Sequence, residues 1–332
     1  SSNDADDSQT STNPSESPRP TKLSSTAPPN NSDDPSTPFL PTDVPTTATT
    51  PPSVSLSPTS SCKLAASNKC FTDRDELKAA VDQYVEGDCD TESECDIGKE
   101  YGWPMNSWDV SHVTNMDYMF SSGDDDYDGD DDWWFYENNV FERFNGDVSS
   151  WDVSSVTSMD KMFYHAYAFN GDVSEWDVSS VNSMEGMFSF ASAFNGDVSE
   201  WDVSSATSME QMFYYAEAFN GDVSEWDVSS VNSMKEMFYS AEAFNGDVSD
   251  WNVSSVTSME KMFQYAKAFN GDLSEWNISS ITSMGMMFYY ANAFNGDVSE
   301  WNVSSITSMA YMFYSAYAFN SSVTSMEGMF HG

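Results

Sequence analysis

The stretch "DDDYDGDDDWWFYENN", residues 124–139, holds the side chains best suited to chemistry. Carboxylates fall at the first, third and fifth positions of a calcium loop, and Gly129 falls at the sixth, where a sharp turn is required. The twelfth position is Phe135 instead of glutamate, with Glu137 two residues later, so the alternative is a solvated acidic loop. The candidate ligands are Asp124, Asp126, Asp128, Asp130 and Asp132.

Groups for catalysis are sparse in the rest of the chain. The histidines are His112, His165 and His331, and none recurs in register with a repeat. No Ser-His-Asp, Cys-His, phosphate-binding or dinucleotide-binding motif stands out. We therefore expect a protein that is not an enzyme and that uses no cofactor other than calcium.

The cysteines form one cluster, which consists of Cys62, Cys70, Cys89 and Cys95. An even number, close spacing and a Ser/Thr/Pro-rich neighbour favour disulfides in an oxidising compartment. A zinc site is the alternative, although no C-x-x-C pair or nearby histidine supports it.

A helix is expected between the second and third cysteines, with Thr72 as its cap and Gly87 at its end. Its apolar face consists of Leu77, Ala80, Val81, Tyr84 and Val85. Such a helix separates Cys70 from Cys89 by about 20 Å. The pairing Cys62–Cys70 with Cys89–Cys95 is therefore preferred, unless a flank folds back.

Residues 1–61 differ in composition from everything that follows. Twelve of the 13 prolines lie between Pro14 and Pro58, among Ser, Thr, Asn and Asp. This composition predicts a disordered stalk, either O-glycosylated or a plain flexible linker. The formal charge of −42 disfavours nucleic acid and anionic lipid as partners. No apolar run is long enough to cross a bilayer.

Seven full repeats of 25 residues occupy 144–318. A partial repeat at 108–120 precedes them, separated by the insertion 121–143, and a shortened repeat at 319–332 follows. The shortened repeat is either a terminal cap or the edge of a truncated chain. Residues 62–107 then form a disulfide-bonded N-terminal cap.

Each repeat combines two apolar patterns. Val148, Trp151 and Val153 have the L-x-x-L-x-L spacing of a leucine-rich-repeat strand, and apolar residues from Met159 to Ala166 have helical spacing. An Asn-Gly-Asp turn lies between repeats, with Gly146 free to adopt a positive φ. Because no unit can bury its apolar face alone, the units must stack. The prediction is an α/β solenoid of strand-turn-helix units.

The segments "SWDVSHVTNMDYMF" and "WDVSSVTSMDKMFYHAYAFNGDVSEW" resemble the repeat of BspA-like leucine-rich-repeat surface proteins, known from mycoplasmas, other bacteria and marine microbial eukaryotes. The resemblance covers residues 108–330, and "CFTDRDELKAAV" is similar to the cap that precedes such repeats. It implies an extracellular or cell-surface, non-enzymatic role in adhesion or recognition.

Several residues recur at one position of every unit and form columns along the stack. We expect the tryptophan column, from Trp151 to Trp301, to be buried, although it could instead stack on sugars. The aspartates from Asp147 to Asp297 are expected to cap turns, with calcium as the alternative. The Ser155–Val156–Thr157 pattern predicts an outward hydroxyl array, either simply solvated or in contact with ice.

Tyrosines collect where the copies vary and where the geometry points outward. They predict a contact surface, with packing against the predicted helices as the alternative. Its members are Tyr164, Tyr167, Tyr214, Tyr215, Tyr239, Tyr265, Tyr289, Tyr290, Tyr314 and Tyr317. Candidate glycosylation sites in N-x-S sequons are Asn30, Asn252, Asn277, Asn302 and Asn320.

These features favour an extracellular or cell-surface scaffold that binds proteins or glycans. The alternative is a structural matrix or ice-contacting protein that uses the regular Ser/Thr face of the solenoid.

Calcium at the acidic insertion should bind weakly, with a Kd of roughly 10⁻⁴ to 10⁻³ M, because a bidentate twelfth ligand is missing. Binding should change the fluorescence of Trp133 and Trp134 and protect the insertion from proteolysis. Asp126→Asn combined with Asp128→Asn should abolish both responses. An unchanged signal at millimolar calcium, or an equal response of the double variant, would leave the insertion a solvated loop.

Overall fold

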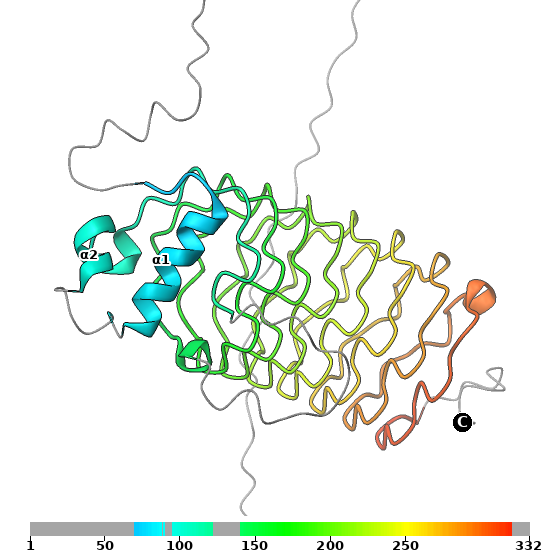
Figure 1. Ribbon diagram of the computed structural model, residues 1–332. Coiled ribbons are helices and arrows are strands. Elements are labelled where there is room, and N and C mark those ends of the chain that lie inside the picture. Colours follow the sequence, from blue (N-terminus) through cyan, green and yellow to red (C-terminus); the bar gives the residue numbers. More distant parts are fainter. Residues whose placement is uncertain (1–69, 88, 90–94, 122–139, 321–332) are drawn as a thin grey trace, which may run out of the picture. The chain divides into compact units, whose positions relative to one another are not determined.

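The computed structural model describes residues 70–87, 89, 95–121 and 140–320, all within one compact unit, Ser55–Gly332. The expected stalk, the calcium-loop aspartates, Cys62 and Asn30 lie outside the described residues. Figure 1 shows the described chain as a row of similar coils with two helices at one end.

The N-terminal cap contains the expected helix, α1 (Arg74–Glu86). Its N-cap is Asp73, one residue later than expected, and the Asp73 side chain accepts a hydrogen bond from the Glu76 N–H at 2.9 Å. A short helix, α2 (Asp96–Tyr101), and a 3-10 turn, η3 (Met105–Ser107), follow. None of the helices in this described part is long and apolar enough to span a membrane.

The predicted disulfide Cys89–Cys95 is confirmed. None of the cysteines in the described part is a free thiol, so the zinc alternative lacks the thiolates it requires. The other predicted pairing, Cys62–Cys70, involves a residue outside the described chain and stays a prediction.

The cap joins the repeats through its aromatic core and its backbone. The Phe71 ring stacks on Tyr101 at 4.4 Å between centroids and lies 5.3 Å from Trp108, the first tryptophan of the repeat series. Arg74 donates two hydrogen bonds to the Asp117 carbonyl at 2.9 and 2.7 Å. Lys78 lies over the ring of Phe141, in the 3-10 turn η5 (Val140–Arg143), at 4.8 Å. The cap therefore covers the end of the stack.

Each full repeat forms one coil, but the predicted helix from Met159 to Ala166 is wrong. Those residues form consecutive turns, and an extended strand is likewise missing from the described repeats. Parallel pairing reduces to one bridge per coil, from Asn115–Ser158 to Ser283–Ser308. A 3-10 turn, η6 (Val303–Ser305), is confined to the last described coil.

Hydrogen bonds between coils explain why a helix does not form. The N–H groups of Met159, Lys161, Phe163 and His165 donate to carbonyls of the next coil at 2.7–3.1 Å. The N–H groups of Met162 and Tyr164 donate three residues back, to the carbonyls of Met159 and Lys161, and the Asp160 N–H donates to the Asp117 carboxylate. An α-helix would direct all of these donors to its own fourth preceding carbonyl and leave the neighbouring coil without partners.

This arrangement requires left-handed backbone at two positions per coil. Lys161 and His165 have φ of 53° and 61°, at the third residue of successive turns, as type II turns require. The equivalent residues of other coils do the same, and only Gly186 is a glycine. The hydrogen bonds to neighbouring coils hold these costly conformations in place.

The glycine of the Asn-Gly-Asp turn allows close packing and does not adopt the expected positive φ at the described positions that follow Gly146. A Cβ on Gly171 would lie 2.9 Å from Cε2 of the Phe169 ring, and the other coils repeat this close approach. The phenylalanine ring therefore packs directly against the glycine backbone.

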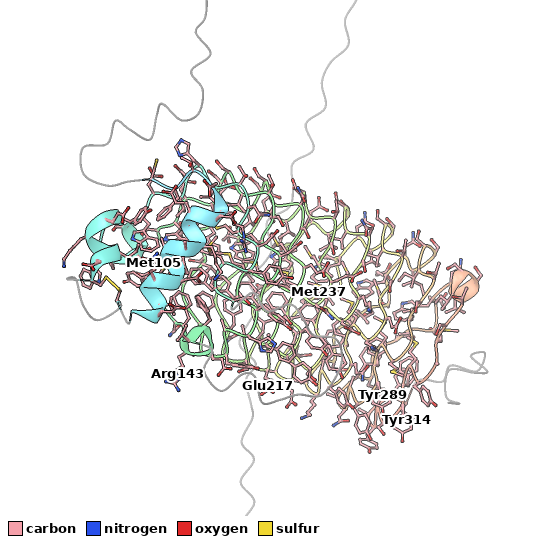
Figure 2. All side chains as sticks on the ribbon, in the orientation of Figure 1. Met105, Arg143, Glu217, Met237, Tyr289 and Tyr314 are labelled. Atoms are coloured by element: carbon pink, nitrogen blue, oxygen red, sulfur yellow. A yellow bond between two sulfur atoms is a disulfide. The ribbon has the colours of Figure 1, made fainter. Side chains whose placement is uncertain are left out.

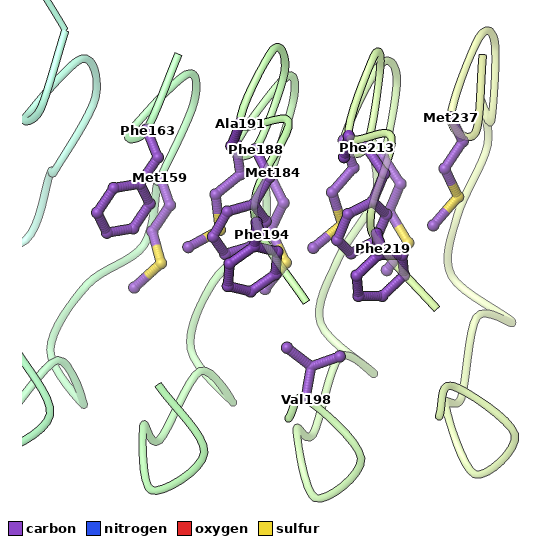
Figure 3. Close-up of a cluster of buried hydrophobic side chains, with 14 of the residues drawn as sticks. Met159, Phe163, Met184, Phe188, Ala191, Phe194, Val198, Phe213, Phe219 and Met237 are labelled. Carbon is purple, nitrogen blue, oxygen red and sulfur yellow. The ribbon is translucent and has the colours of Figure 1, made fainter. Parts of the chain in front are cut away.

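The core consists of the apolar columns that the repeat pattern predicts. Val148, Trp151 and Met159 are 0–3% exposed, so their predicted burial is confirmed although the strand and helix are not. Phe188 and Phe194, six residues apart in sequence, stack at 3.8 Å, and the equivalent phenylalanines Phe194 and Phe219 of successive repeats stack at 6.0 Å (Figure 3). Each layer of the core thus packs on a copy of itself.

The tryptophan column is part of this core and cannot serve as an exposed sugar platform. Trp226 is 3% exposed, stacks between Trp201 and Trp251 at 6.5 and 6.4 Å, and donates from Nε1 to the Val198 carbonyl at 2.9 Å.

Trp226→Ala should lower the free energy of unfolding by roughly 3–5 kcal/mol, as expected for a large-to-small core substitution. Trp226→Phe retains a ring but loses the hydrogen bond to Val198, so an intermediate loss is expected. Tyr317→Ala, at a side chain that is 77% exposed, is the control and should change little. Chemical denaturation measures all three; a loss below about 1 kcal/mol for Trp226→Ala would contradict the packing argument.

Candidate functional site

A ridge of aromatic side chains runs along the side of the stack that is formed by the consecutive turns of residues 160–165 and their equivalents. We call it the tyrosine ridge. Its members are Tyr164, His165, Phe190, Tyr214, Tyr215, Tyr239, Tyr265, Tyr289, Tyr290 and Tyr314. Contacting rings of successive coils lie 4.4–5.9 Å apart, so the ridge is continuous over seven coils. Figure 2 shows Tyr289 and Tyr314 next to each other on the edge where Glu217 also lies.

The ridge contains most of the predicted contact tyrosines and also includes two residues that are not tyrosines. Phe190 and His165 fill positions that hold tyrosine in other coils. Because the described repeats contain no α-helix, the rings pack on one another and not on the predicted helices. Tyr167 and Tyr317 lie beside the ridge in a neighbouring column.

Mutual stacking leaves the inner rings half-buried. Tyr239 packs on Tyr214 at 4.7 Å and on Tyr265 at 5.7 Å. Burial raises the pKa of the Tyr239 phenol, and the neighbouring tyrosines Tyr215 and Tyr214 raise it further. At the last described coil the rings are more open, with Tyr314 50% and Tyr317 77% exposed. The end of the described ridge therefore offers more ring surface than its inner part.

His165 is the most buried titratable group of the ridge. It is 6% exposed, packs on Tyr164 and Phe190 at 4.2 and 4.4 Å, and has Nδ1 3.0 Å from the Tyr167 hydroxyl. Burial lowers the pKa of this imidazole from 6.5 to about 4. The folded protein thus holds His165 neutral at physiological pH.

The predicted turn-capping role of the aspartate column is supported by its hydrogen bonds. Asp172 Oδ1 accepts from the Ser174 N–H at 3.0 Å and from the Ser174 hydroxyl at 2.8 Å. These bonds lower the pKa of Asp172, and the pKa values of Asp197, Asp222, Asp247 and Asp297 are lowered for the same reason. Local donors thus stabilise the carboxylates although like charges recur in each coil.

A second exposed column makes the same turn with either aspartate or asparagine. Asp177 Oδ1 accepts from Ser179, and Asn252 Oδ1 accepts from the Ser254 N–H at 3.2 Å and its hydroxyl at 2.7 Å. Replacement of aspartate by asparagine in this column therefore preserves the turn. The sequon residues of the described chain are exposed: Asn252, Asn277, Asn302 and Asn320.

The outward Thr/Asn column is tied to the backbone. The Thr157 hydroxyl donates to the Thr114 carbonyl at 3.1 Å, and the Thr207 hydroxyl donates to the Asn182 carbonyl at 3.0 Å. Asn182 and Asn232 interrupt the threonines. The expected hydroxyl array is therefore exposed but irregular, with its protons directed along the stack.

Two polar columns were missed by the sequence reasoning. Asn145 Oδ1 accepts from the Asn170 N–H at 2.8 Å, and this ladder continues coil by coil to Asn320. Asp160 Oδ1 accepts from the Ser183 hydroxyl at 2.5 Å, and burial raises the pKa of Asp160 despite that bond. Strict recurrence of asparagine after each repeat's first phenylalanine was the available signal.

Two other features, a cluster of possible metal ligands and a surface groove, give little support for metal binding or catalysis. Donor atoms of Cys70, Asp109 and His112 lie within 4.8 Å of one another, but Cys70 is disulfide-bonded and cannot supply a thiolate. An open groove of about 510 Å³ between two coils is lined by Ser174, Glu175, Trp176, Asp177, Val178, Asp197, Glu200 and Asp202. This lining includes no nucleophile–base pair.

Acid should destabilise the ridge through His165. Because its folded pKa of about 4 lies below the ordinary 6.5, stability is lost as pH falls from about 6.5 toward 4, by on the order of 3 kcal/mol. His165→Phe should remove this part of the pH dependence, since Phe190 occupies the same position with the same φ of 61°. Denaturation at pH 7 and 4.5 measures the difference; equal pH dependence in both proteins would contradict the assignment.

Comparison with known proteins rests on the repeats and the cap. No curated protein matches the chain. A family described as "Mycoplasma protein of unknown function, DUF285" matches residues 90–134, 132–250 and 219–326, in three overlapping segments as expected of a repeat. Those segments cover most of the chain and nearly all of the described coils, and the chain therefore belongs to the DUF285 family.

Proposed function

We propose that this protein is an extracellular or cell-surface repeat scaffold that mediates adhesion or recognition of proteins or glycans, without catalysis. The observation that carries the proposal is a contrast along the stack. Core positions such as Met162 and Phe163 recur in every coil, whereas the tyrosine ridge and its neighbouring columns change from coil to coil. A scaffold for binding needs this combination of a fixed core and a variable surface.

The chemistry of the ridge suits recognition. Tyrosine contributes a large, rigid contact area with few rotatable bonds, and its hydroxyl can donate or accept hydrogen bonds. Ridge rings already pack on one another, so they lose little freedom when a partner binds. Charged side chains flank the ridge, including the pair Lys267–Glu242 at 2.5 Å. A partner would meet aromatic side chains bordered by charges.

The location is proposed from other features. The Cys89–Cys95 disulfide suits an oxidising compartment, and a Ser/Thr/Pro-rich tract suits a stalk. A closer relationship to BspA-like leucine-rich-repeat surface proteins, within or beside the DUF285 family, is part of the same proposal and favours a surface role.

Binding arrays with the full chain test the proposal. Protein, cell and glycan arrays should identify a ligand whose binding weakens when Tyr214, Tyr215 and Tyr239 are all replaced by Phe, because these changes remove the hydroxyls and keep the packing. The matched control replaces Asp172, Asp197 and Asp222 by Asn on the acidic turns, and it should bind normally. A ligand lost only in the aspartate variant would place recognition elsewhere.

The structural or ice-contacting alternative predicts a different result. It requires thermal hysteresis or ice shaping that disappears when Thr257, Thr282 and Thr307 are replaced by bulky residues. The interrupted threonine column and its backbone-directed hydroxyls give this alternative less support.

A further inference from the structure

Each full repeat carries an Asn-Gly pair in its first turn, and this pair can modify itself. The asparagines concerned are Asn145, Asn170, Asn195, Asn220, Asn245, Asn270 and Asn295. Because glycine has no Cβ, its backbone nitrogen can approach the preceding side-chain amide closely. The nitrogen can then attack Cγ of the asparagine, so that a C–N bond forms and Nδ2 leaves as ammonia with the glycine N–H proton. Water opens the resulting succinimide to aspartate or isoaspartate.

Burial does not protect these amides. All seven asparagine side chains are exposed, so water can reach Cγ and ammonia can leave. Whether the reaction proceeds in the folded protein therefore depends on how the amide and the following glycine are held.

The amide is held by the next coil. Asn220 Oδ1 accepts a hydrogen bond from the Asn245 N–H at 2.8 Å. The asparagine ladder repeats this bond for all seven residues, at 2.7–2.9 Å. The Asn220 amide is thus tied to the neighbouring coil, whereas the attacking nitrogen, that of Gly221, belongs to its own coil. Attack requires nitrogen and Cγ about 3–3.5 Å apart with the correct approach, and the ladder bond restrains the side chain from turning to meet that requirement.

The glycine is held by packing. A Cβ on Gly221 would lie 2.9 Å from Cε2 of the Phe219 ring and 3.4 Å from the Gly196 carbonyl oxygen. The aromatic ring and the preceding coil therefore leave the Asn220–Gly221 peptide little room to rotate into a succinimide.

The ladder bond has a second, opposing effect. An N–H that donates to Oδ1 polarises the side-chain carbonyl and could stabilise the negative charge that develops on it during attack. This stabilisation counts only when nitrogen and Cγ are already in the attack geometry. Since the ladder bond and the packed glycine both oppose that geometry, we expect restraint to prevail.

We propose that the seven Asn-Gly pairs are deamidation sites, which the closed stack keeps unreactive and which local opening of a coil releases. Isoaspartate adds the side-chain methylene to the main chain, so a modified coil would no longer match the donors and acceptors of its neighbours. The ladder thereby protects the register of the stack. This inference goes beyond the proposed recognition function and does not depend on it.

Peptide mapping by mass spectrometry tests the proposal on the full chain. The chain is incubated at neutral pH, folded or unfolded in guanidinium, and chromatography separates the isoaspartate peptides. The seven sites should react about tenfold more slowly, or more slowly still, in the folded chain, because reaction there requires a local opening. Equal rates in the folded and unfolded chains would overturn the proposal.

A proline variant tests the ladder bond itself. Asn245→Pro removes the N–H that Asn220 accepts and leaves the Asn220–Gly221 pair unchanged. Deamidation of Asn220 should become about fivefold faster, as expected for the loss of one hydrogen bond. Asn245→Ala keeps that N–H and is the matched control, since both variants lose the side chain that accepts from the Asn270 N–H. Its Asn220 should react at the unchanged rate.

Asn170, two coils before Asn220, is the reference within each molecule. Faster reaction of Asn220 with an unchanged rate at Asn170 supports the proposal. An unchanged or slower rate at Asn220 in Asn245→Pro would overturn it, because the bond would then be neutral or would assist attack. Faster reaction at both sites would mean that the proline opens the whole stack, and the folded and unfolded rates of the unchanged chain then decide the matter.

Discussion

Main-chain hydrogen bonding between coils is the constraint on which the structure depends. Every second N–H from Met159 to His165 points to the next coil, and the same donors recur in each full repeat up to the sixth. This register demands identical backbone in neighbouring coils, including two left-handed residues per coil. It also explains why the repeat length stays constant at 25 residues from Phe144 to Ala318. An inserted residue would move all following donors away from their acceptors.

Identical backbone places each core side chain beside a copy of itself. Flat rings satisfy this condition well, since Phe213 and Phe238 stack at 5.5 Å with 6° between their planes. Methionine fills the remaining space with a flexible, polarisable chain. The tryptophans add a hydrogen bond to a carbonyl of the preceding coil, so their polar group is satisfied inside the core. Variation within the core columns is limited to similar apolar residues, such as Ala206 where other coils have valine or isoleucine.

The same geometry separates charge on the surface. Aspartates on the exposed turns recur coil after coil, and each is stabilised by its own serine instead of by a basic neighbour. The lysines of the full repeats all lie in the later part of the unit: Lys161, Lys235, Lys261 and Lys267. There they pair with carboxylates, as Lys261 does with Glu236 at 2.8 Å, or cover rings, as Lys161 does. A solenoid that repeats one unit thus acquires distinct faces through position alone.

The sequence by itself determined the repeat length, the buried columns, the cap helix and the Cys89–Cys95 pairing. Apolar spacing reveals which residues must be buried, because that requirement is independent of backbone conformation. The calcium loop and Cys62 lie outside the described residues, so the calcium site and the Cys62–Cys70 pairing rest on the sequence. The columns that hold the ridge tyrosines were also readable, because they vary between copies, whereas the half-buried state of most of these rings was not.

Only the tertiary structure decided the backbone of the repeat. The spacing from Met159 to Ala166 fits a helix as well as a series of turns, and the choice depends on donors in the neighbouring coil. The asparagine ladder and the stacking of the ridge depend on the same neighbours, which no single repeat contains. Local sequence cannot distinguish a hydrogen bond made within a unit from one made to the next unit, and in this fold the second kind prevails.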